Sequence, residues 1–292
     1  MTRKIARFLH INRSGYIVLS VFLLTVMLIV IVWWPLAEAQ LALIDWQRPV
    51  WSQVDGLPFG IFGAMSLLLL VGADLKHDAR LAAIGLLGGL VIETWGTTTN
   101  LWHYYTAERP PLWIIPAWPI ASLAIDRLYR FLRYGLLRSS HHLAGGHALY
   151  WLVFPTFYVV MVAFVHPYLG APLTLAALLL CALIIITPID VWAMVLTFAA
   201  GAGGGYFLEL WGTTRGCWTY YTAETPPLFA VLAHGMAAVA FWRTGQLLTT
   251  LFSRLQFLNG QRSQIAHGTT TPGDNRRLAA ISDGAGVTTD DR

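Results

Sequence analysis

The sequence contains little charge and little cysteine for its length. Of its 292 residues only 12% are charged, whereas 56% are hydrophobic and the mean hydropathy is +0.58. A chain this apolar has no polar half that could keep it in solution, so its composition excludes a soluble domain and indicates a polytopic membrane protein. Cys181 and Cys217 lie in an apolar run and in a loop, and therefore predict neither a disulfide nor a cysteine-based metal site.

The common motifs of catalysis and metal binding are also missing. The sequence has no phosphate-binding loop, no dinucleotide fingerprint and no Ser/His/Asp arrangement in a usable context. Histidines cluster only at His141, His142 and His147, whereas a membrane di-iron oxygenase needs several such groups. We interpret this cluster as a solvated loop and expect neither a metal nor a cofactor.

Apolar stretches recur along the chain, separated by short polar segments. We expect each stretch to form a transmembrane helix, because a helix satisfies all its backbone hydrogen bonds within the bilayer. The predicted fold is therefore all-α, a bundle of about eight transmembrane helices. The expected spans are 16–34, 57–72, 81–95, 112–125, 148–165, 172–188, 191–211 and 228–241.

The positions of the basic residues predict the orientation in the membrane. With the N-terminus in the cytoplasm, 16 of the 19 Lys and Arg residues fall in inner segments, and only Arg48, Arg109 and Arg215 fall outside. Because cytoplasmic loops carry an excess of Lys and Arg, we expect the plasma or inner membrane, with both termini cytoplasmic. The same asymmetry accounts for the pI near 9.2, so the positive charge predicts no nucleic-acid partner.

One segment of 20 residues occurs twice. Residues 93–112 read ETWGTTTNLWHYYTAERPPL and residues 209–228 read ELWGTTRGCWTYYTAETPPL, with 14 identities at an ungapped offset of 116. Chance agreement is rare in a segment rich in Trp, Tyr, Thr, Glu and Pro, so the chain contains an internal repeat. An even number of expected spans separates the copies, which predicts two parallel halves related by a twofold axis along the membrane normal.

The repeat divides the chain into three predicted parts. Residues 1–138 form the first four-helix repeat, which contains motif 93–112, and residues 139–253 form the second, which contains motif 209–228. Residues 254–292 form a cytoplasmic tail. Its final part is mainly Thr, Gly, Asp and Arg, so we expect the tail to be largely disordered.

An aspartate precedes each motif at the same distance. Asp74 lies 19 residues before Glu93. The same spacing separates Asp190 from Glu209. As a helix this distance is roughly 28 Å, close to the thickness of the hydrocarbon layer. We therefore expect one helix from each Asp to its Glu, with the Asp as the N-cap.

Each glutamate lies on a helix face that contains glycine. Gly85, Gly89 and Glu93 are spaced by four residues, as are their counterparts 116 residues later. Such a face lets two helices approach closely and directs the carboxyl group into the bundle. If the two faces meet, Glu93 and Glu209 approach each other, cannot both ionise easily, and supply an acid and a base. In the alternative, each glutamate only bonds the Thr, Trp and Tyr groups that follow it.

An aromatic segment follows each glutamate, as an outer loop or a re-entrant segment. Gly96 and Gly212 permit a break from the helix there. Trp and Tyr are typical of the membrane interface, but a wall of aromatic rings beside an acid is also what a carbocation needs. His234 takes the position of Trp118, so the halves are chemically unequal. The residues expected to bind a substrate are Trp95, Trp102, Tyr104, Tyr105, Trp211, Trp218, Tyr220, Tyr221 and His234.

The second motif resembles two families of membrane enzymes. Residues 209–222, ELWGTTRGCWTYYT, are similar to the E-l-x-G-x-x-x-G-x-x-F-G-x-Y-x-Y motif of the membrane carotenoid hydratases of bacterioruberin synthesis. Residues 218–220 resemble the G-x-W-x-Y/F stretch of membrane lycopene cyclases. Both families handle polyenes by protonation chemistry in the bilayer. The resemblance implies an isoprenoid or carotenoid-like lipid as the substrate.

Three classes of function remain open at this point. As an enzyme, the protein would hydrate or cyclise an isoprenoid chain, with Glu93 and Glu209 as the catalytic proton donor and acceptor. As a carrier, it would bind a cation or a proton-coupled solute at the same acids. As a scaffold or assembly protein, it would use its loops as a docking surface. The expected partner is a membrane lipid or isoprenoid, and the sequence predicts no oligomeric state.

Overall fold

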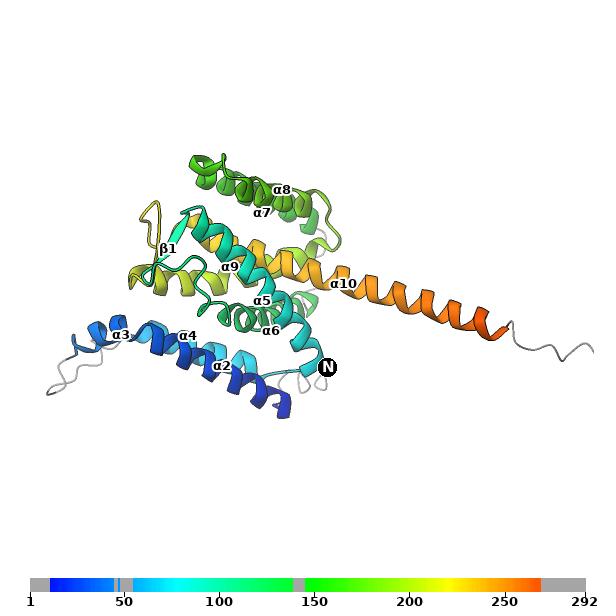
Figure 1. Cartoon of the computed structure of the whole chain (residues 1–292), viewed down its shortest axis with the longest axis horizontal. Coiled ribbons are helices and arrows are strands. Elements are labelled where there is room, and N and C mark those ends of the chain that lie inside the picture. The colour runs from blue at the N-terminus through cyan, green and yellow to red at the C-terminus, as the bar shows by residue number, and fades with distance from the viewer. Residues whose placement is uncertain (1–10, 45–46, 48–54, 139–144, 269–292) are drawn as a thin grey trace, which may run out of the picture. The chain divides into compact units, whose positions relative to one another are not determined.

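The computed structural model describes residues 11–44, 47, 55–138 and 145–268 (Figure 1). Within these residues the chain is mostly helical, and two short strands form one sheet. The elements are α2 (Arg13–Val32), α3 (Trp34–Leu41), α4 (Gly56–Leu70), α5 (Leu75–Thr98), β1 (Trp102–Tyr104), α6 (Ala117–Arg138), α7 (Gly146–Val165), η3 (His166–Tyr168), α8 (Pro172–Ile186), α9 (Val191–Thr214), β2 (Trp218–Tyr220) and α10 (Leu228–Gly268).

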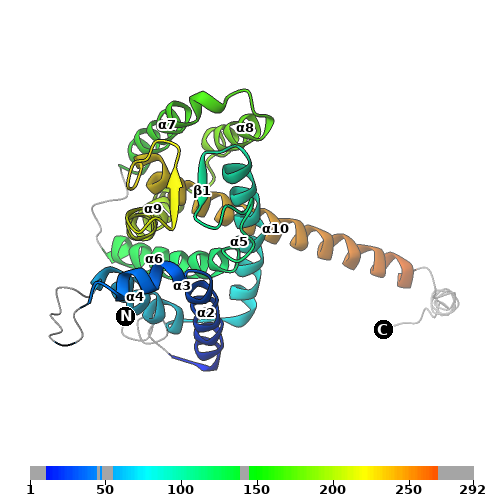
Figure 2. The same cartoon turned by 60° about the vertical axis from the view of Figure 1, so that its left-hand side comes forward.

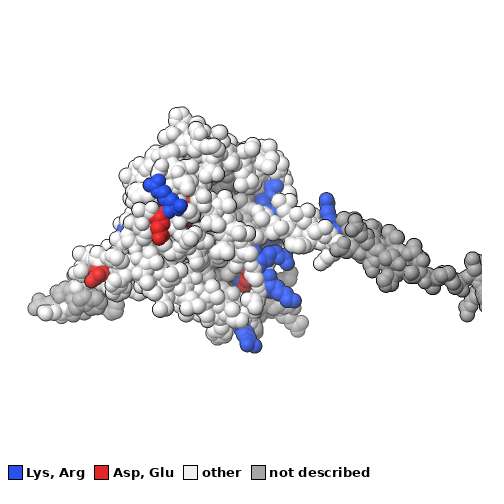
Figure 3. Space-filling view, viewed as in Figure 1, with Lys and Arg blue, Asp and Glu red and all other residues white. Residues whose placement is uncertain are grey.

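Five of the described helices are long and apolar enough to cross a membrane. They are α2, α5, α7 with η3, α9, and α10 as far as Gln256, while α4 and α8 are shorter apolar helices. On the face shown in Figure 3 the charged side chains gather near the ends and leave the middle uncharged, as a lipid-facing surface requires. These helices confirm the predicted all-α class and indicate a multi-pass membrane protein.

A helix occurs at each of the eight places where the sequence predicts one, and the largest differences in bounds are at α6 and α10. α6 begins at Ala117 and not at 112, because turns end the aromatic segment first. α10 continues to Gly268, so the first part of the predicted tail is helical. Residues 269–292, like His141 and His142, lie outside the described residues.

Contacts divide the chain into two compact units, Met1–Gly245 and Gln246–Arg292. Both copies of the motif, and all the helices from α2 to α9, lie in the first unit. The two halves share one body, and the sites described below are contained in it.

The aspartates before α5 and α9 are N-caps, as predicted. The carboxylate of Asp74 accepts hydrogen bonds from the backbone N–H groups of Lys76 (3.0 Å) and His77 (3.2 Å). The carboxylate of Asp190 accepts one hydrogen bond, from the backbone N–H of Ala193 (2.9 Å). Because these bonds favour the charged form, they lower the pKa of Asp74.

The glycine faces of α5 and α9 do not pack against each other. A Cβ on Gly89 would lie 2.2 Å from the ring of Trp118 in α6, and a Cβ on Gly205 would lie 2.5 Å from His234 in α10. Each glycine face therefore receives the next long helix of its own half. The hypothesis that the glutamates approach because the two glycine faces meet is wrong, since α6 and α10 occupy those faces.

The two copies of the motif instead meet through a small sheet (Figure 2, β1 and the yellow strand). The strands are antiparallel, with Trp102 opposite Tyr220 and Tyr104 opposite Trp218. Exchanging the two copies leaves this pairing unchanged, so the sheet has local twofold symmetry. These strands are not predicted from the sequence, because a three-residue strand is too short to show an alternating pattern.

A second tyrosine of each motif ties the sheet to the bundle. The hydroxyl of Tyr105 donates to the carbonyl oxygen of Val32, at the end of α2. The hydroxyl of Tyr221 donates to the carbonyl oxygen of Phe164, at the end of α7. The equivalent tyrosines therefore hold the first helix of each half in equivalent ways.

Candidate functional site

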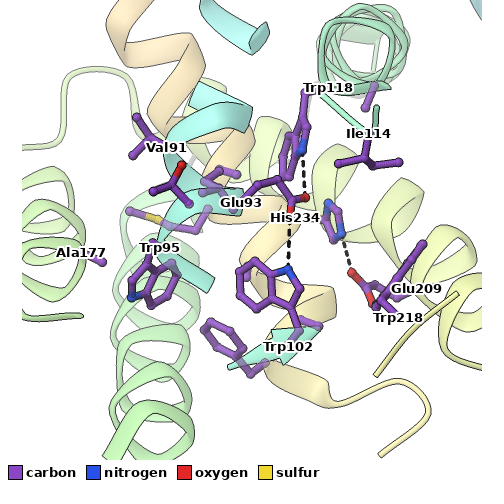
Figure 4. A pocket seen from close by; sticks show the side chains of 18 of the residues that line it. Val91, Glu93, Trp95, Trp102, Ile114, Trp118, Ala177, Glu209, Trp218 and His234 are labelled. Atoms are coloured by element: carbon purple, nitrogen blue, oxygen red, sulfur yellow. Dashed lines mark hydrogen bonds and ion pairs between the residues drawn. The ribbon is translucent and has the colours of Figure 1, made fainter. Parts of the chain in front are cut away.

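Glu93 is buried near the C-terminal end of α5 and accepts three hydrogen bonds (Figure 4). Its Oε2 accepts from Nε1 of Trp102 at 3.1 Å. Its Oε1 accepts from the hydroxyl of Tyr104 at 2.9 Å and from Nε1 of Trp118 at 3.1 Å. These donors come from β1 and α6, so one carboxyl group joins three elements.

Glu209 is buried in an equivalent environment in α9. Its Oε2 accepts from Nε1 of Trp218 at 2.9 Å, and its Oε1 accepts from the hydroxyl of Tyr220 at 3.0 Å. The third partner is His234, whose Nε2 lies 2.9 Å from Oε1 (Figure 4). The partners follow at the same sequence separations as in the first half, 9, 11 and 25 residues.

A glycine in each helix makes room for the first indole. A Cβ on Gly96 would lie 1.9 Å from the ring of Trp102, and one on Gly212 would lie 2.0 Å from that of Trp218. Both glycines are inside their helices, which continue to residues 98 and 214. The break from the helix that these glycines permit does not occur at either position. They are needed because the tryptophan ring crosses the helix at that position to reach the glutamate.

The chain reverses just after each helix. Asn100 and Gly216 occupy equivalent positions and have φ angles of 58° and 67°. Asn and Gly are the residues that adopt this left-handed conformation most readily. The reversal brings the backbone N–H of the next residue back to the carbonyl oxygen of Gly96 or Gly212, at 2.9 Å in both copies.

The two sites differ in what their third partner can do. An indole N–H only donates, whereas an imidazole nitrogen donates or accepts according to its protonation. Both oxygens of Glu93 face an indole N–H, so this carboxyl group is a fixed acceptor. In Glu209 only Oε2 faces an indole N–H, whereas Oε1 faces a tyrosine hydroxyl and His234. Glu209 and His234 can therefore exchange a proton, while Glu93 and Trp118 cannot.

The two sites adjoin each other. The rings of Trp118 and His234 are stacked, with their centroids 5.9 Å apart and an angle of 21° between the planes. An aromatic face at this distance stabilises a protonated imidazole. Trp118, a partner of Glu93, thus forms one wall of the site in which Glu209 and His234 can exchange a proton.

Both glutamates line a single cavity of about 620 Å³. This volume is within the range of sites for drug-sized ligands. Apart from the two glutamate sites, its walls are largely apolar side chains of α5, α8 and α10. The structure brings together at this cavity the following predicted site residues: Glu93, Glu209, Trp95, Trp102, Tyr104, Trp211, Trp218, Tyr220 and His234.

Two predicted substrate-binding residues are placed elsewhere. Tyr105 and Tyr221 do not line the cavity, and their hydroxyls are bonded to the backbone of α2 and α7. Two tryptophans that line it were missed, Trp33 and Trp118. Trp118 could have been found, because it lies 116 residues before His234.

A buried ionic cluster, which the sequence analysis also missed, joins α5 and α6 near the other end of α5. Arg127 is fully buried and lies 2.5 Å from Asp78 and 3.0 Å from Asp126. At the offset of 116, Met194 takes the place of Asp78. The cluster therefore belongs to the first half alone, which is why the repeat gave no signal for it.

The described residues contain no group of three or more His, Cys, Asp or Glu side chains arranged to hold a metal ion. His147 lies in the first turn of α7. Burial raises the pKa of the Cys217 thiol to about 12, so this cysteine is a poor nucleophile at neutral pH.

Comparison of the chain with known protein families, curated proteins and solved structures finds no match. The resemblance to carotenoid hydratases and lycopene cyclases stays a prediction, based on the motif alone.

Proposed function

We propose that the protein is a membrane enzyme that transfers a proton to and from an apolar lipid chain bound in the cavity. The observation that supports this most is the position of the Glu209–His234 pair, 2.9 Å apart, in the wall of an otherwise apolar cavity of about 620 Å³. A carboxyl group and an imidazole in contact can pass a proton between them and present it to a bound molecule.

An isoprenoid or other polyene is the substrate class that suits this chemistry. Glu209, protonated on Oε1, gives its proton to one carbon of a double bond, and the other carbon becomes a cation. The rings of Trp102, Trp118 and Trp218 in the cavity wall stabilise that positive charge. Attack by water or by a second double bond then forms a C–O or C–C bond. Loss of a proton, taken up by the Glu209–His234 pair, completes a hydration or a cyclisation.

Glu93 has a different role in this proposal. Its two oxygens hold the indoles of Trp102 and Trp118 at the cavity, so it positions the aromatic wall and does not exchange a proton. This replaces the hypothesis in which Glu93 and Glu209 act as an acid and a base of one pair. Each half then contributes the same scaffold, and one half contributes the proton.

We further propose eight membrane spans in two parallel four-helix repeats, with both termini in the cytoplasm. The reciprocal pairing of β1 with β2 and the equivalent bonds of Tyr105 and Tyr221 support the repeat. The distribution of Lys and Arg, 16 inner against three outer, supports the orientation. A reporter fused between residues 138 and 145 should be active only as a cytoplasmic reporter. A periplasmic signal there would contradict this orientation.

The function is tested by lipid extraction and mass spectrometry of cells that carry no copy of the gene, the wild type, or Glu209→Gln. A lipid that has gained one water, or has cyclised without a change of mass, should appear with the wild type only. Glu224→Gln is the matched control, since Glu224 is an exposed acid of the same motif. Identical lipid profiles in all strains would contradict the enzyme and favour a scaffold or assembly protein.

A further inference from the structure

The cavity that holds the two glutamate sites is elongated along α8. Six side chains of α8, from Leu173 to Ile184, line it. Eleven residue steps in a helix correspond to about 16 Å. A space of this length and volume fits an extended hydrocarbon chain better than a compact solute.

Several side chains that line the cavity are also exposed on the outside of the bundle. Val91 of α5 is 67% exposed, and Leu180 of α8 is 52% exposed. All the residues that line the cavity and are exposed lie on two helices. Because these residues belong to α5 and α8, the cavity opens along the seam between those two helices. Figure 4 shows Val91 and Ala177 on the same side of Glu93.

The seam is closed by a polar contact at one end and is apolar beyond it. Nε1 of Trp95 donates to Oγ1 of the fully buried Thr174 at 3.2 Å. From there toward the other end of α8 the seam is bordered by Val91, Ala177 and Leu180. An apolar opening on an apolar flank admits hydrocarbon and disfavours water or a charged solute, which would lose its hydration there.

The corresponding seam of the other half is built differently. α4 is the counterpart of α8 in chain order, and it packs directly against α9. Of the described residues that line the cavity, none belongs to α4. The opening is therefore found on one side of the pseudo-twofold axis.

We propose that the seam between α5 and α8 is a lateral opening through which the hydrocarbon chain of a bilayer lipid enters the cavity. The substrate class is then a lipid that reaches the site from within the membrane. This inference rests on the proposed function only in using the same cavity. It holds for a bound chain whether or not Glu209 transfers a proton to it.

The test is photo-cross-linking of the purified full-length protein in phosphatidylcholine vesicles that contain a lipid with a diazirine in its acyl chain. Peptide mass spectrometry locates the adducts. We expect adducts on side chains that line the cavity, such as Ala177 and Cys181, in addition to the outward Leu179. Adducts confined to outward side chains such as Leu179 would overturn the proposal.

A pair of variants of α8 sharpens this test. Ala177→Phe fills the seam and should abolish the adducts inside the cavity. Leu179→Phe introduces the same ring on the outward face, where Leu179 is 70% exposed, and should leave them unchanged. Undiminished cavity adducts in Ala177→Phe would contradict entry by the seam. If that variant does not elute as folded protein, Cys181→Phe at the same wall takes its place.

The outcomes distinguish this inference from the proposed function. Adducts in the cavity together with an unchanged lipid profile in the Glu209→Gln strain would keep the lateral opening and contradict the acid–base chemistry. A lipid product that depends on Glu209, without adducts in the cavity, would keep the chemistry and contradict the opening.

Discussion

The two buried glutamates have the same scaffold and different third partners. Glu93 and Glu209 each accept from a tryptophan and a tyrosine of their own strand, at distances that agree within 0.2 Å. The third partner is Trp118 in one half and His234 in the other. One substitution in a duplicated frame therefore separates a carboxyl group that only accepts hydrogen bonds from one that can exchange a proton.

The two halves also differ at the ends of the helices remote from the motif. In the first half Arg127 is fully buried against Asp78 and Asp126. In the second half Met194 stands where Asp78 would be, and Arg243 bonds to the backbone carbonyl oxygens of α8 and the residue after it. The halves are thus alike around the glutamates and unlike at the other end. The variants below compare equivalent positions in the two halves.

The largest difference in stability between the two halves is expected on replacing the equivalent arginines, Arg127 and Arg243. Arg127→Met leaves Asp78 buried without its cation, which should lower the free energy of unfolding by about 3–5 kcal/mol. Arg243 is half-buried, and Arg243→Met removes only its hydrogen bonds to two backbone carbonyls and to the hydroxyl of Thr187, with an expected cost of about 1–2 kcal/mol. Thermal unfolding of both variants in detergent measures the difference. Equal losses would show that the buried cluster does not stabilise the first half.

The next largest loss of stability is expected at the glycines that make room for an indole ring, and it should be equal in the two halves. Gly96→Ala and Gly212→Ala each place a Cβ about 2 Å from an indole ring, so each should cost about 1–3 kcal/mol and disrupt the tryptophan–glutamate bond. Gly203→Ala is the control, because a Cβ on this exposed glycine of α9 meets no atom within 4 Å. The readout is again thermal unfolding, with tryptophan fluorescence. A Gly96→Ala protein as stable as the Gly203→Ala protein would mean that the ring does not need that space.

The smallest change in stability is expected when the second site is made like the first. His234→Trp supplies an indole N–H to Glu209, and the indole of Trp118 already occupies the equivalent place beside Gly89 in the other half, as His234 does beside Gly205. Stability should change by less than about 1 kcal/mol, whereas the lipid product should be lost, because an indole at position 234 can neither take up nor return the proton of Glu209. Unfolding temperature and lipid profile are measured on the same preparations. A product that survives this substitution would exclude His234 from the chemistry.

The sequence was sufficient for the features that are local within each copy of the repeat. The matching segments located Glu93 and Glu209, and the spacing from Asp74 and Asp190 gave the starts of α5 and α9. These features are local, because a cap or a helix face depends on residues a few positions apart.

The features that the sequence did not predict depend on contacts between distant segments. The pairing of β1 with β2 joins residues more than one hundred positions apart, and three-residue strands carry no pattern of their own. The role of Gly96 was misassigned, because a glycine inside a helix indicates a break and a close approach equally well. The cluster around Arg127 has no counterpart in the second half and was therefore invisible to a comparison of the repeats.

Glu93 is a fixed hydrogen-bond acceptor and Glu209 is not, and a glutamine at each position separates the two cases. In Glu93→Gln the amide nitrogen must face one of the two indole N–H groups. Two buried N–H donors then point at each other and have no acceptor between them. In Glu209→Gln the amide oxygen can accept from Trp218, and the amide nitrogen can donate to Tyr220 or His234.

The most direct measurement is the thermal stability of Glu93→Gln and Glu209→Gln, purified side by side in the same detergent. Glu93→Gln should lose about 1–3 kcal/mol, the cost of a buried donor without an acceptor. Glu209→Gln should keep nearly the stability of the wild type and lose the lipid product. Equal stability losses, or a larger loss in Glu209→Gln, would contradict the assignment of a fixed and an exchangeable site.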